Sequence, residues 1–325
     1  MLYILQGYQM IKKYKLIYLL ILFFAVCLCT IFSIALGPVP ISIFNLTGDT
    51  QSLIIFNIRL PRAIAAALCG AGLAGAGTAM QALFRNDLAD PYILGTSAGG
   101  AVGVSLVMAL GLFMLIPLAA FIGAITSVFL VCLLASRNGR INTSVLLLTG
   151  IAVSTFLSAV VSVFMVFSGQ NMHQIMFWLM GGLWNVSWDD IPLLLLFFIP
   201  VALLFLFSRD LNIITCGESE IRTLGINPNH VKLLLLAASA GITGIVVSVA
   251  GSIGFIGLVA PHLTRIITGP DHSVLIPASL CIGGLLLLFA DTISRTYLSD
   301  LPVGVVTAFF GAPFFLLLIR RKIAI

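Results

Sequence analysis

Apolar segments of about 20 residues recur along this chain, and no other feature limits its fold as strongly. A helix needs roughly 20 apolar residues to cross the hydrocarbon core of a bilayer. A soluble protein of 325 residues needs a charged surface, which 16 Lys and Arg with 11 Asp and Glu cannot supply at a mean hydropathy of +1.18. We therefore predict an all-α polytopic membrane protein, a single transmembrane domain over residues 1–325, with ten spans at about 16–36, 60–82, 92–111, 115–135, 144–167, 190–208, 231–251, 254–268, 273–295 and 303–320.

Two segments resemble other kinds of structure. The first apolar run follows three lysines, as a signal peptide does, but it is about 21 residues long and no Ala-x-Ala site follows it, so we predict a retained span. Residues 172–188 are too short and too mixed to cross a membrane and carry three tryptophans. Tryptophan is typical of the membrane–water interface, so we expect an interfacial or re-entrant helix there.

The basic residues are distributed unevenly over this topology. With Lys12, Lys13 and Lys15 inside, 13 of the 16 Lys and Arg residues fall on the inner side, as the positive-inside rule requires. Both termini are then predicted to be cytoplasmic, in the plasma (inner) membrane of a bacterium. The three exceptions, on the outer side, are Arg59, Arg62 and Arg295.

Arg59 and Arg62 lie three positions apart in the stretch RLPR, at the start of an apolar run. Pro61 is acceptable in the first turn of a helix, where its missing N–H leaves no hydrogen bond unmade. Spacing of i, i+3 places both guanidinium groups on one side of that turn. They either anchor the helix at the membrane edge or bind a partner. Arg295 lies four residues after Asp291, which predicts a local ion pair on one helix face.

Glycines are frequent in the second and third spans. CGAGLAGAG contains a literal Gly-x-Gly-x-x-Gly, but a dinucleotide site needs a preceding strand and an exposed helix start, and these glycines lie inside an apolar segment. Small residues four apart allow helices to approach closely in a membrane. We therefore predict helix packing at Gly70, Gly72, Gly75, Gly99 and Gly103.

Catalytic and cofactor motifs are absent from the sequence. It contains no His-Glu-x-x-His, Gly-x-Ser-x-Gly or Gly-x-x-x-x-Gly-Lys-Ser/Thr, so we expect no catalytic residue, no ATP site and no cofactor. The six cysteines show no paired metal spacing, and no metal site is predicted. The net charge of +5 includes no run of five or six basic residues, so we expect lipid and no nucleic acid as a partner.

The longest inner loop, residues 209–232, is polar and helix-forming from Glu218 to Leu224, and Gly225 supplies a stop. A short helix across the inner face would suit a cytoplasmic partner. A solvated connector is the alternative interpretation.

Four stretches spread from residue 59 to 321 resemble the FecCD family, the permease subunits of type II ABC importers for iron-siderophores, haem and vitamin B12. They are RLPRAIAAALCGAGLAGAGTAMQALFRNDLADPYILGTSAGGA, GESEIRTLGIN, AGSIGFIGLVAPHLTRIITGPDHSVLIPASL and LPVGVVTAFFGAPFFLLLIRR. Two positions depart from the commoner pattern. Asn86-Asp87-Leu88 stands where Asn-Pro-Leu is usual, and the loss of this proline is expected to loosen the turn after the second span. Asp300 precedes LPVG where Glu is common.

The resemblance implies ten spans with an inverted repeat, spans 2–5 against 7–10, and a translocation path between two permease copies, a homodimer or a heterodimer. It implies two ATPase subunits on the inner side and a soluble substrate-binding protein outside. By position, it assigns ATPase coupling to Gly217, Glu218, Leu224 and Gly225. It assigns docking of the binding protein to Arg59, Arg62 and Arg295.

The sequence gives little information about which residues line the translocation path. Serines every four residues give the fifth span one weakly polar face, although hydrogen bonds between helices would explain them equally well. The candidates are Ser158, Ser162, Met165, Met172, Met176 and Trp178. We predict a permease carrying an iron(III)-siderophore, with haem and cobalamin as further cargoes. The alternative is an ion-coupled secondary transporter, which would need mid-membrane carboxylates that we do not find.

Overall fold

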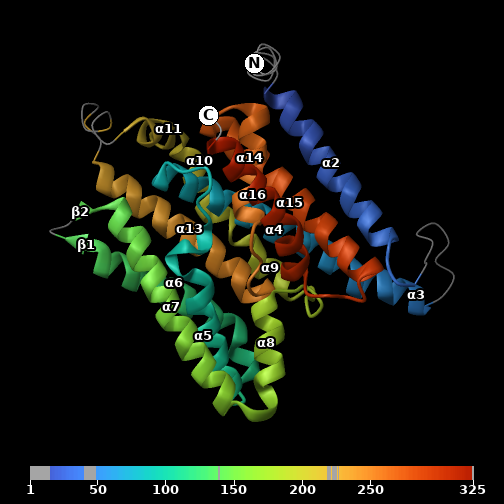
Figure 1. Cartoon of the computed structure of the whole chain (residues 1–325). Coiled ribbons are helices and arrows are strands. Elements are labelled where there is room, and N and C mark those ends of the chain that lie inside the picture. Colours follow the sequence, from blue (N-terminus) through green and yellow to red (C-terminus); the bar gives the residue numbers. More distant parts are fainter. Residues whose placement is uncertain are drawn as a thin grey trace.

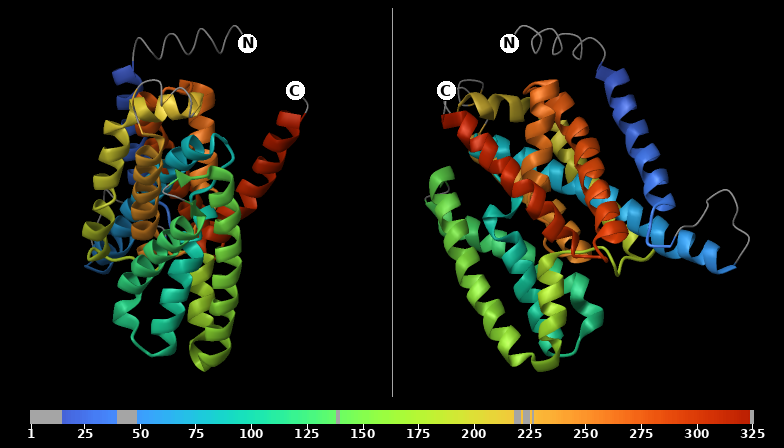
Figure 2. Two further views of the ribbon diagram at one scale, coloured as in Figure 1. Left: turned by 90° about the vertical axis from the view of Figure 1, so that its left-hand side faces the viewer. Right: turned by 45° about the vertical axis from the view of Figure 1, so that its right-hand side comes forward.

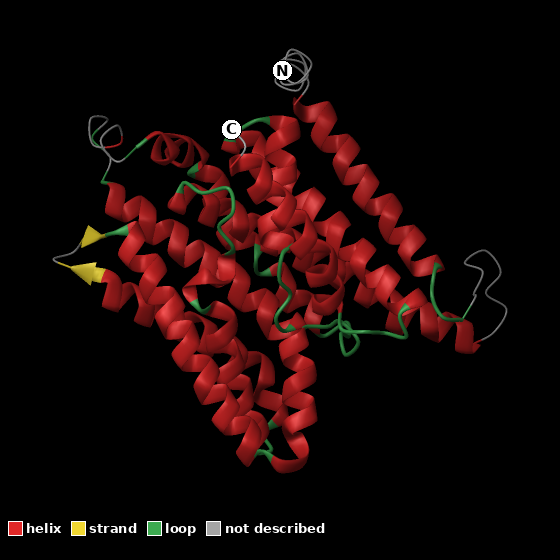
Figure 3. Cartoon of the chain, in the orientation of Figure 1, coloured by secondary structure: helices red, strands yellow, loops and turns green. Residues whose placement is uncertain are grey.

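The computed structural model describes residues 15–39, 49–137, 140–217, 221, 225 and 227–323. Helices make up most of this part, loops join them, and the strands among the described residues form one short antiparallel hairpin of β1 (Ser136–Arg137) and β2 (Arg140–Ile141), as Figure 3 shows. Lys232 secures the hairpin, because its buried Nζ donates to the Ile141 carbonyl at 2.7 Å.

Every predicted span falls on helix. Within the described residues, six helices are long and apolar enough to cross a membrane. A bent pair, Asp190–Leu206 with Ser208–Cys216, raises the number to seven if it is counted as one span. The six helices are α2 (Lys15–Ala35), the helical run Thr50–Phe84, the run Phe113–Ala135 made of η3 (Phe113–Leu115) and α6 (Ile116–Ala135), α7 (Thr143–Phe167), α13 (Pro228–Ala250) and α15 (His272–Tyr297). Three shorter apolar helices are α5 (Thr96–Ala109), α14 (Ile256–Thr268) and the stretch Val303–Leu318 of α16 (Val303–Ile323).

The second span begins earlier than its sequence predicts. Helix continues from α3 (Asp49–Leu53) through the π-helix η1 (Ile54–Arg59) into α4 (Leu60–Phe84), so Pro61 lies in the first turn of α4, but this turn is not the start of the span. The π-helix accounts for this, because the Leu60 N–H donates to the Ile55 carbonyl five residues back and the ladder is already shifted where Pro61 lacks an N–H.

The sixth span is broken. It consists of α9 (Asp190–Leu195) and α10 (Phe198–Leu206), and α11 (Ser208–Cys216) turns away by 58°. Only the first part of the tryptophan-rich segment 172–188 is helical, as the nine-residue α8 (Met172–Met180) with Trp178, and Trp184 and Trp188 lie in the loop that follows. Two 3-10 turns precede helices: η4 (Gly169–Asn171) before α8 and η2 (Pro91–Leu94) before α5.

Helix α4 is the centre of the molecule and α2 its edge. In the most apolar 18 residues of each run, 78% of the residues of Thr50–Phe84 are buried and only 11% of those of α2 (Figures 1 and 2). α4 packs most extensively on α15 and also on α13 and α14. The pairing is reciprocal, since α6 packs on α13 as α15 packs on α4, and α5 on α6 as α14 on α15. This is the pattern expected of an inverted repeat.

Glycine makes these contacts close. A Cβ added at Gly70 would overlap the carbonyl of Gly283 on α15, and one at Gly72 would meet Val246 on α13. The other three predicted packing glycines lie at similar contacts, Gly75 against Leu280, Gly99 against Gly123 and Gly103 against Ala119. Backbones approach this closely only where the side chain is missing.

The start of α2 and α11 lie toward the top of Figure 1, and α3 lies at the right. We call the end of the molecule with α11, the start of α13 and the start of α15 the loop end. The arginine end is the region around Arg59, Arg62 and Arg295.

Candidate functional site

The three arginines converge although they come from distant parts of the chain. Arg59 closes the π-helix, Arg62 lies in the first turn of α4 and Arg295 in the last turn of α15. Their exposed fractions are 4%, 6% and 6%. A buried guanidinium must find hydrogen-bond acceptors within the protein, and each of the three does.

Arg62 lies between two carboxylates. Its Nε donates to Asp291 Oδ1 at 2.9 Å. Its Nη1 and Nη2 form a fork with Asp300, at 3.2 and 2.6 Å. Asp291 is wholly buried, whereas the side chain of Asp300 is 45% exposed. Both edges of the planar guanidinium are therefore occupied, one inside the protein and one at its surface.

Arg59 and Arg295 hold the end of α2. Arg59 donates to the carbonyls of Ile34 and Ala35 at 3.2 and 3.3 Å and to that of Val39 at 2.6 Å. Arg295 Nη2 donates to the carbonyl and hydroxyl of Ser33. The last carbonyls of a helix lack partners within it and carry partial negative charge, so two cations stabilise this terminus.

The sequence predicts these arginines on the outer side, at the membrane edge. The structure buries all three side chains within the protein. The predicted Asp291–Arg295 pair is present but loose, with Arg295 Nε 3.7 Å from Asp291 Oδ2. Both atoms, and Arg295 Nη1, have no hydrogen-bond partner among the described residues. Docking of a partner at this cluster stays a prediction, now for side chains that also hold the protein's own helices.

At the loop end, the predicted coupling loop follows α11. Gly217 and Gly225 adopt φ of +152° and +75°, which favour glycine, and Ile221 between them is fully buried. Glu218 and Leu224 lie outside the described residues. Coupling to an ATPase stays a prediction for all four.

A polar network that the sequence did not reveal joins α11 to α15 and α2. Asp271 accepts from Lys15 Nζ and Asn212 Nδ2, each at 3.1 Å, and from the Ser273 N–H at the start of α15. Asn212 Oδ1 also accepts from the His272 N–H at 2.9 Å. Burial acts to raise the pKa of Asp271, but the hydrogen bonds from Ser273, Asn212 and Lys15 outweigh it and lower that pKa below its usual value.

Asp87, the departure from Asn-Pro-Leu, forms an ion pair with Arg265 of α14. The sequence predicted a looser turn after the second span. The ion pair ties that turn to α14.

A cavity of about 400 Å³, here called the serine cavity, lies between α5, α7 and α8. Three of the predicted path residues line it, Ser158, Ser162 and Met165. The two serine hydroxyls donate to carbonyls one turn back in α7, at 2.9 and 3.0 Å. The lining is neutral: Tyr92, Ser97, Ala98, Ala101, Ser154, Ser158, Val161, Ser162, Met165, Leu179 and Ser252.

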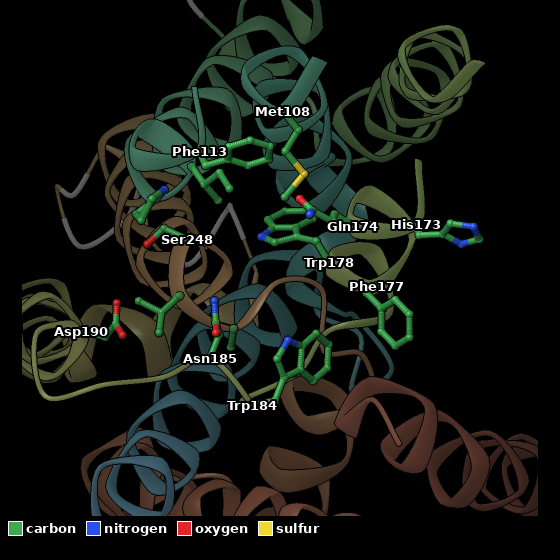
Figure 4. A pocket seen from close by; sticks show the side chains of 15 residues that line it. Met108, Phe113, His173, Gln174, Phe177, Trp178, Trp184, Asn185, Asp190 and Ser248 are labelled. Atoms are coloured by element: carbon green, nitrogen blue, oxygen red, sulfur yellow. The ribbon is translucent and has the colours of Figure 1, made fainter. Parts of the chain in front are cut away.

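A larger cavity of about 700 Å³, the aromatic cavity, lies on the other side of α8, between it, α6, α9 and α13. In Figure 4, Trp178, Trp184 and Phe177 border it and the His173 ring points away. The Phe177 and Trp184 rings meet edge to face at 5.9 Å. Trp184 lies over Gly182, where any Cβ would overlap its ring.

The predicted path set is thus divided. Trp178 lines the aromatic cavity, Ser158, Ser162 and Met165 line the serine cavity, and Met172 and Met176 lie exposed on α8 outside both linings. Neither lining contains Lys or Arg, and Asp190 is the carboxylate in the aromatic cavity, held by the N–H and hydroxyl of Ser187 at 2.9 and 3.1 Å. The arrangement can enclose a bulky solute without strong charge contacts.

Known proteins resemble this chain over most of its length. The cobalamin import system permease protein of Halobacterium salinarum is 43% identical, covering 84% of this chain and 75% of its own. The hemin transport system permease protein of Yersinia pestis is 42% identical, covering 85% and 86%. A solved chain described as an inward-facing conformation of a metal-chelate type ABC transporter superposes with a TM-score of 0.85 at 30% identity, covering 94% of this chain and 99% of that one.

A family model agrees with the predicted resemblance. It matches residues 18–321, which is nearly the whole chain and includes the arginine cluster, the loop end and both cavities. The chain belongs to the FecCD transport family.

Proposed function

We propose that this chain is the permease subunit of a binding-protein-dependent ABC importer that carries a metal chelate into the cytoplasm. The observation that carries the proposal is the likeness over 94% of the chain to a solved ABC transporter of the metal-chelate type. Hydrolysis of ATP would take place in separate subunits, because the sequence contains no phosphate-binding loop.

The cargo would be an iron(III)-siderophore, haem or cobalamin. Relatives named for cobalamin and haemin support the last two. The siderophore rests on the family resemblance alone. The neutral lining of the serine cavity suits any of these as a surface that encloses cargo without binding it tightly.

The assembly would contain two copies of the permease, two ATPase subunits at the loop end and a substrate-binding protein at the arginine end. A homodimer is the simplest arrangement. Gly217, Glu218, Leu224 and Gly225 would meet the ATPase, and the arginine cluster would meet the binding protein. Both termini would lie in the cytoplasm, with the chain in the plasma membrane, since this places most of the basic residues inside.

Uptake by the reconstituted importer tests the proposal. The permease, its ATPase and its binding protein are placed in liposomes, and entry of labelled cyanocobalamin, haemin and ferric siderophores is measured with and without ATP. We expect ATP-dependent entry of one class of chelate. Entry driven instead by a proton or sodium gradient, without ATP, would contradict the proposal.

A variant on the wall of the serine cavity sharpens the test. Ser162→Trp should block uptake while ATP hydrolysis continues, because the indole fills the cavity that Ser162 lines. Thr155→Trp is the matched control, since Thr155 is exposed on the same helix but lies outside that lining. Equal uptake by the two variants would remove the serine cavity from the path.

A further inference from the structure

The arginine cluster carries an excess of positive charge. Arg59, Arg62 and Arg295 bring three guanidinium groups, and the carboxylates that face them among the described residues are Asp291 and Asp300. Within the described ranges, the hydrogen-bond acceptors of Arg59 are all backbone carbonyls. An uncompensated buried charge is costly, so this end of the protein favours the approach of one more anion.

The two carboxylates differ in how firmly they are held. Asp291 lies within α15 and is fully buried. Asp300 lies in the turn between α15 and α16, where Ser299 and Asp300 adopt φ of +52° and +62°. Two consecutive residues other than glycine in the left-handed region store conformational energy that the surrounding contacts must balance. Asp300 is thus the exposed carboxylate, on the strained element.

Backbone hydrogen bonds hold this turn, among them those from the Leu298 N–H to the Ser294 carbonyl at 3.1 Å and from the Leu301 N–H to the Leu298 carbonyl at 3.2 Å. The Asp300 N–H donates to the Ser294 carbonyl at 3.1 Å, and the Ser294 hydroxyl donates to the Leu301 carbonyl. The fork on Arg62 is the side-chain contact of Asp300. The Nη1–Nη2 edge of Arg62 is therefore the part of the cluster that a partner can reach by replacing a surface group.

We propose that Asp300 is an internal substitute for a carboxylate of the docking protein, which displaces it from the Nη1–Nη2 edge of Arg62. The inference rests on the proposed docking function and adds the residue that docking must displace. A Glu or Asp of the partner presents the same two oxygens, so the fork re-forms with no change in its geometry. Because one ion pair breaks as another forms, docking gains little net energy and stays reversible.

The turn leads directly into α16. The Gly304 N–H, in the first turn of that helix, donates to the Gly181 carbonyl at 3.1 Å, next to α8. Displacement of Asp300 would therefore relax a turn that is joined, through α16, to the segment between the two cavities.

Asp300→Asn tests the exchange, because it weakens the internal competitor and keeps the shape of the side chain. The probe is the substrate-binding protein encoded with this permease, labelled with a fluorophore and titrated onto the permease–ATPase complex in nanodiscs. Asp300→Asn should lower the dissociation constant about two- to fivefold, the range of one exposed ion pair. Asp300→Glu should bind as wild type does.

Asp189→Asn is the matched control for long-range charge. Asp189 is exposed on the same end, next to Trp188, whose Nε1 donates to the Phe56 carbonyl of η1 at 2.8 Å. Its removal should change docking less than the Asp300 variant does. Equal effects of the two variants, or weaker docking by Asp300→Asn, would overturn the exchange.

Arg62→Lys separates this inference from the docking function itself. Lysine keeps the charge but cannot form the fork, so docking should weaken, with folding checked by size-exclusion chromatography. If folded Arg62→Lys docks as wild type, the docking role fails and the exchange fails with it. If Arg62→Lys weakens docking but Asp300→Asn does not strengthen it, only the exchange is wrong.

Discussion

The two ends of α15 are held by different kinds of polar cluster. At the arginine end, three guanidinium groups and two carboxylates come together, and all but Asp300 are buried. At the loop end, Asp271 binds Lys15 and Asn212, and the side chains of Lys15 and Asp271 are 37% and 27% exposed. Water can solvate the charged groups at the loop end and is largely excluded from those at the arginine end. The same types of ion pair should therefore contribute very differently to stability.

The charge count adds to this contrast. The described loop-end pairs, Lys15–Asp271 and Arg265–Asp87, each match one cation with one anion. Among the described residues, the cluster of Arg59, Arg62 and Arg295 has one cation more than the carboxylates that contact it. This excess of positive charge suits an anionic partner, whereas each loop-end ion pair is already electrically neutral.

Replacing Asp291 should have the largest effect. Asp291→Ala leaves Arg62 and Arg295 buried without their shared carboxylate, and we expect a loss of about 3–5 kcal/mol in the free energy of unfolding. Unfolding in mixed micelles with increasing dodecyl sulfate, followed by circular dichroism, measures it. Asp189→Ala is the surface control and should change stability by less than about 0.5 kcal/mol. A cost for Asp291→Ala no larger than this control would remove the contrast between the ends.

The loop-end pair should have a smaller effect that depends on pH. Asp271→Asn keeps an acceptor for the Ser273 N–H but loses the Lys15 bridge, so we expect about 0.2–1 kcal/mol at pH 7. The folded pKa of Asp271 lies below its unfolded value, so this contribution is complete above about pH 4 and is lost as the pH falls further and the carboxyl is protonated.

Unfolding of wild type and Asp271→Asn from pH 7 to pH 3 measures that dependence. The difference between them should shrink at the acid end. Asp271→Ala also removes the N-cap of α15 and should cost about 1 kcal/mol more. A difference that stays constant down to pH 3 would show that the charge of Asp271 contributes nothing.

Hydropathy predicted the helices because each span is a local property of about 20 residues. The sequence also isolated Arg59, Arg62 and Arg295, since they violate a rule about the sides of the membrane. It could not predict that these arginines are buried. Arg62 and Asp300 are 238 positions apart in the sequence, and their contact depends on how α4 packs on α15. The predicted start of the second span was too late for a local reason, because α3 and a π-helix lead directly into α4, in whose first turn Pro61 lies.

The smallest effect should come from Asp87, and it tests whether a loop-end ion pair replaces a proline. The Asp87 side chain is 48% exposed and that of Arg265 17%, so Asp87→Asn should cost about 0.2–0.5 kcal/mol, the lower part of the range for an exposed ion pair, and less in 1 M salt. Asp87→Pro restores Asn-Pro-Leu and stiffens the unfolded chain, which recovers about 0.4–1 kcal/mol where the backbone already fits proline. Asp87→Pro should therefore be at least as stable as Asp87→Asn and insensitive to salt. If it is the less stable of the two, this turn has a backbone that proline cannot adopt, and the ion pair is part of a different turn rather than a substitute for the usual one.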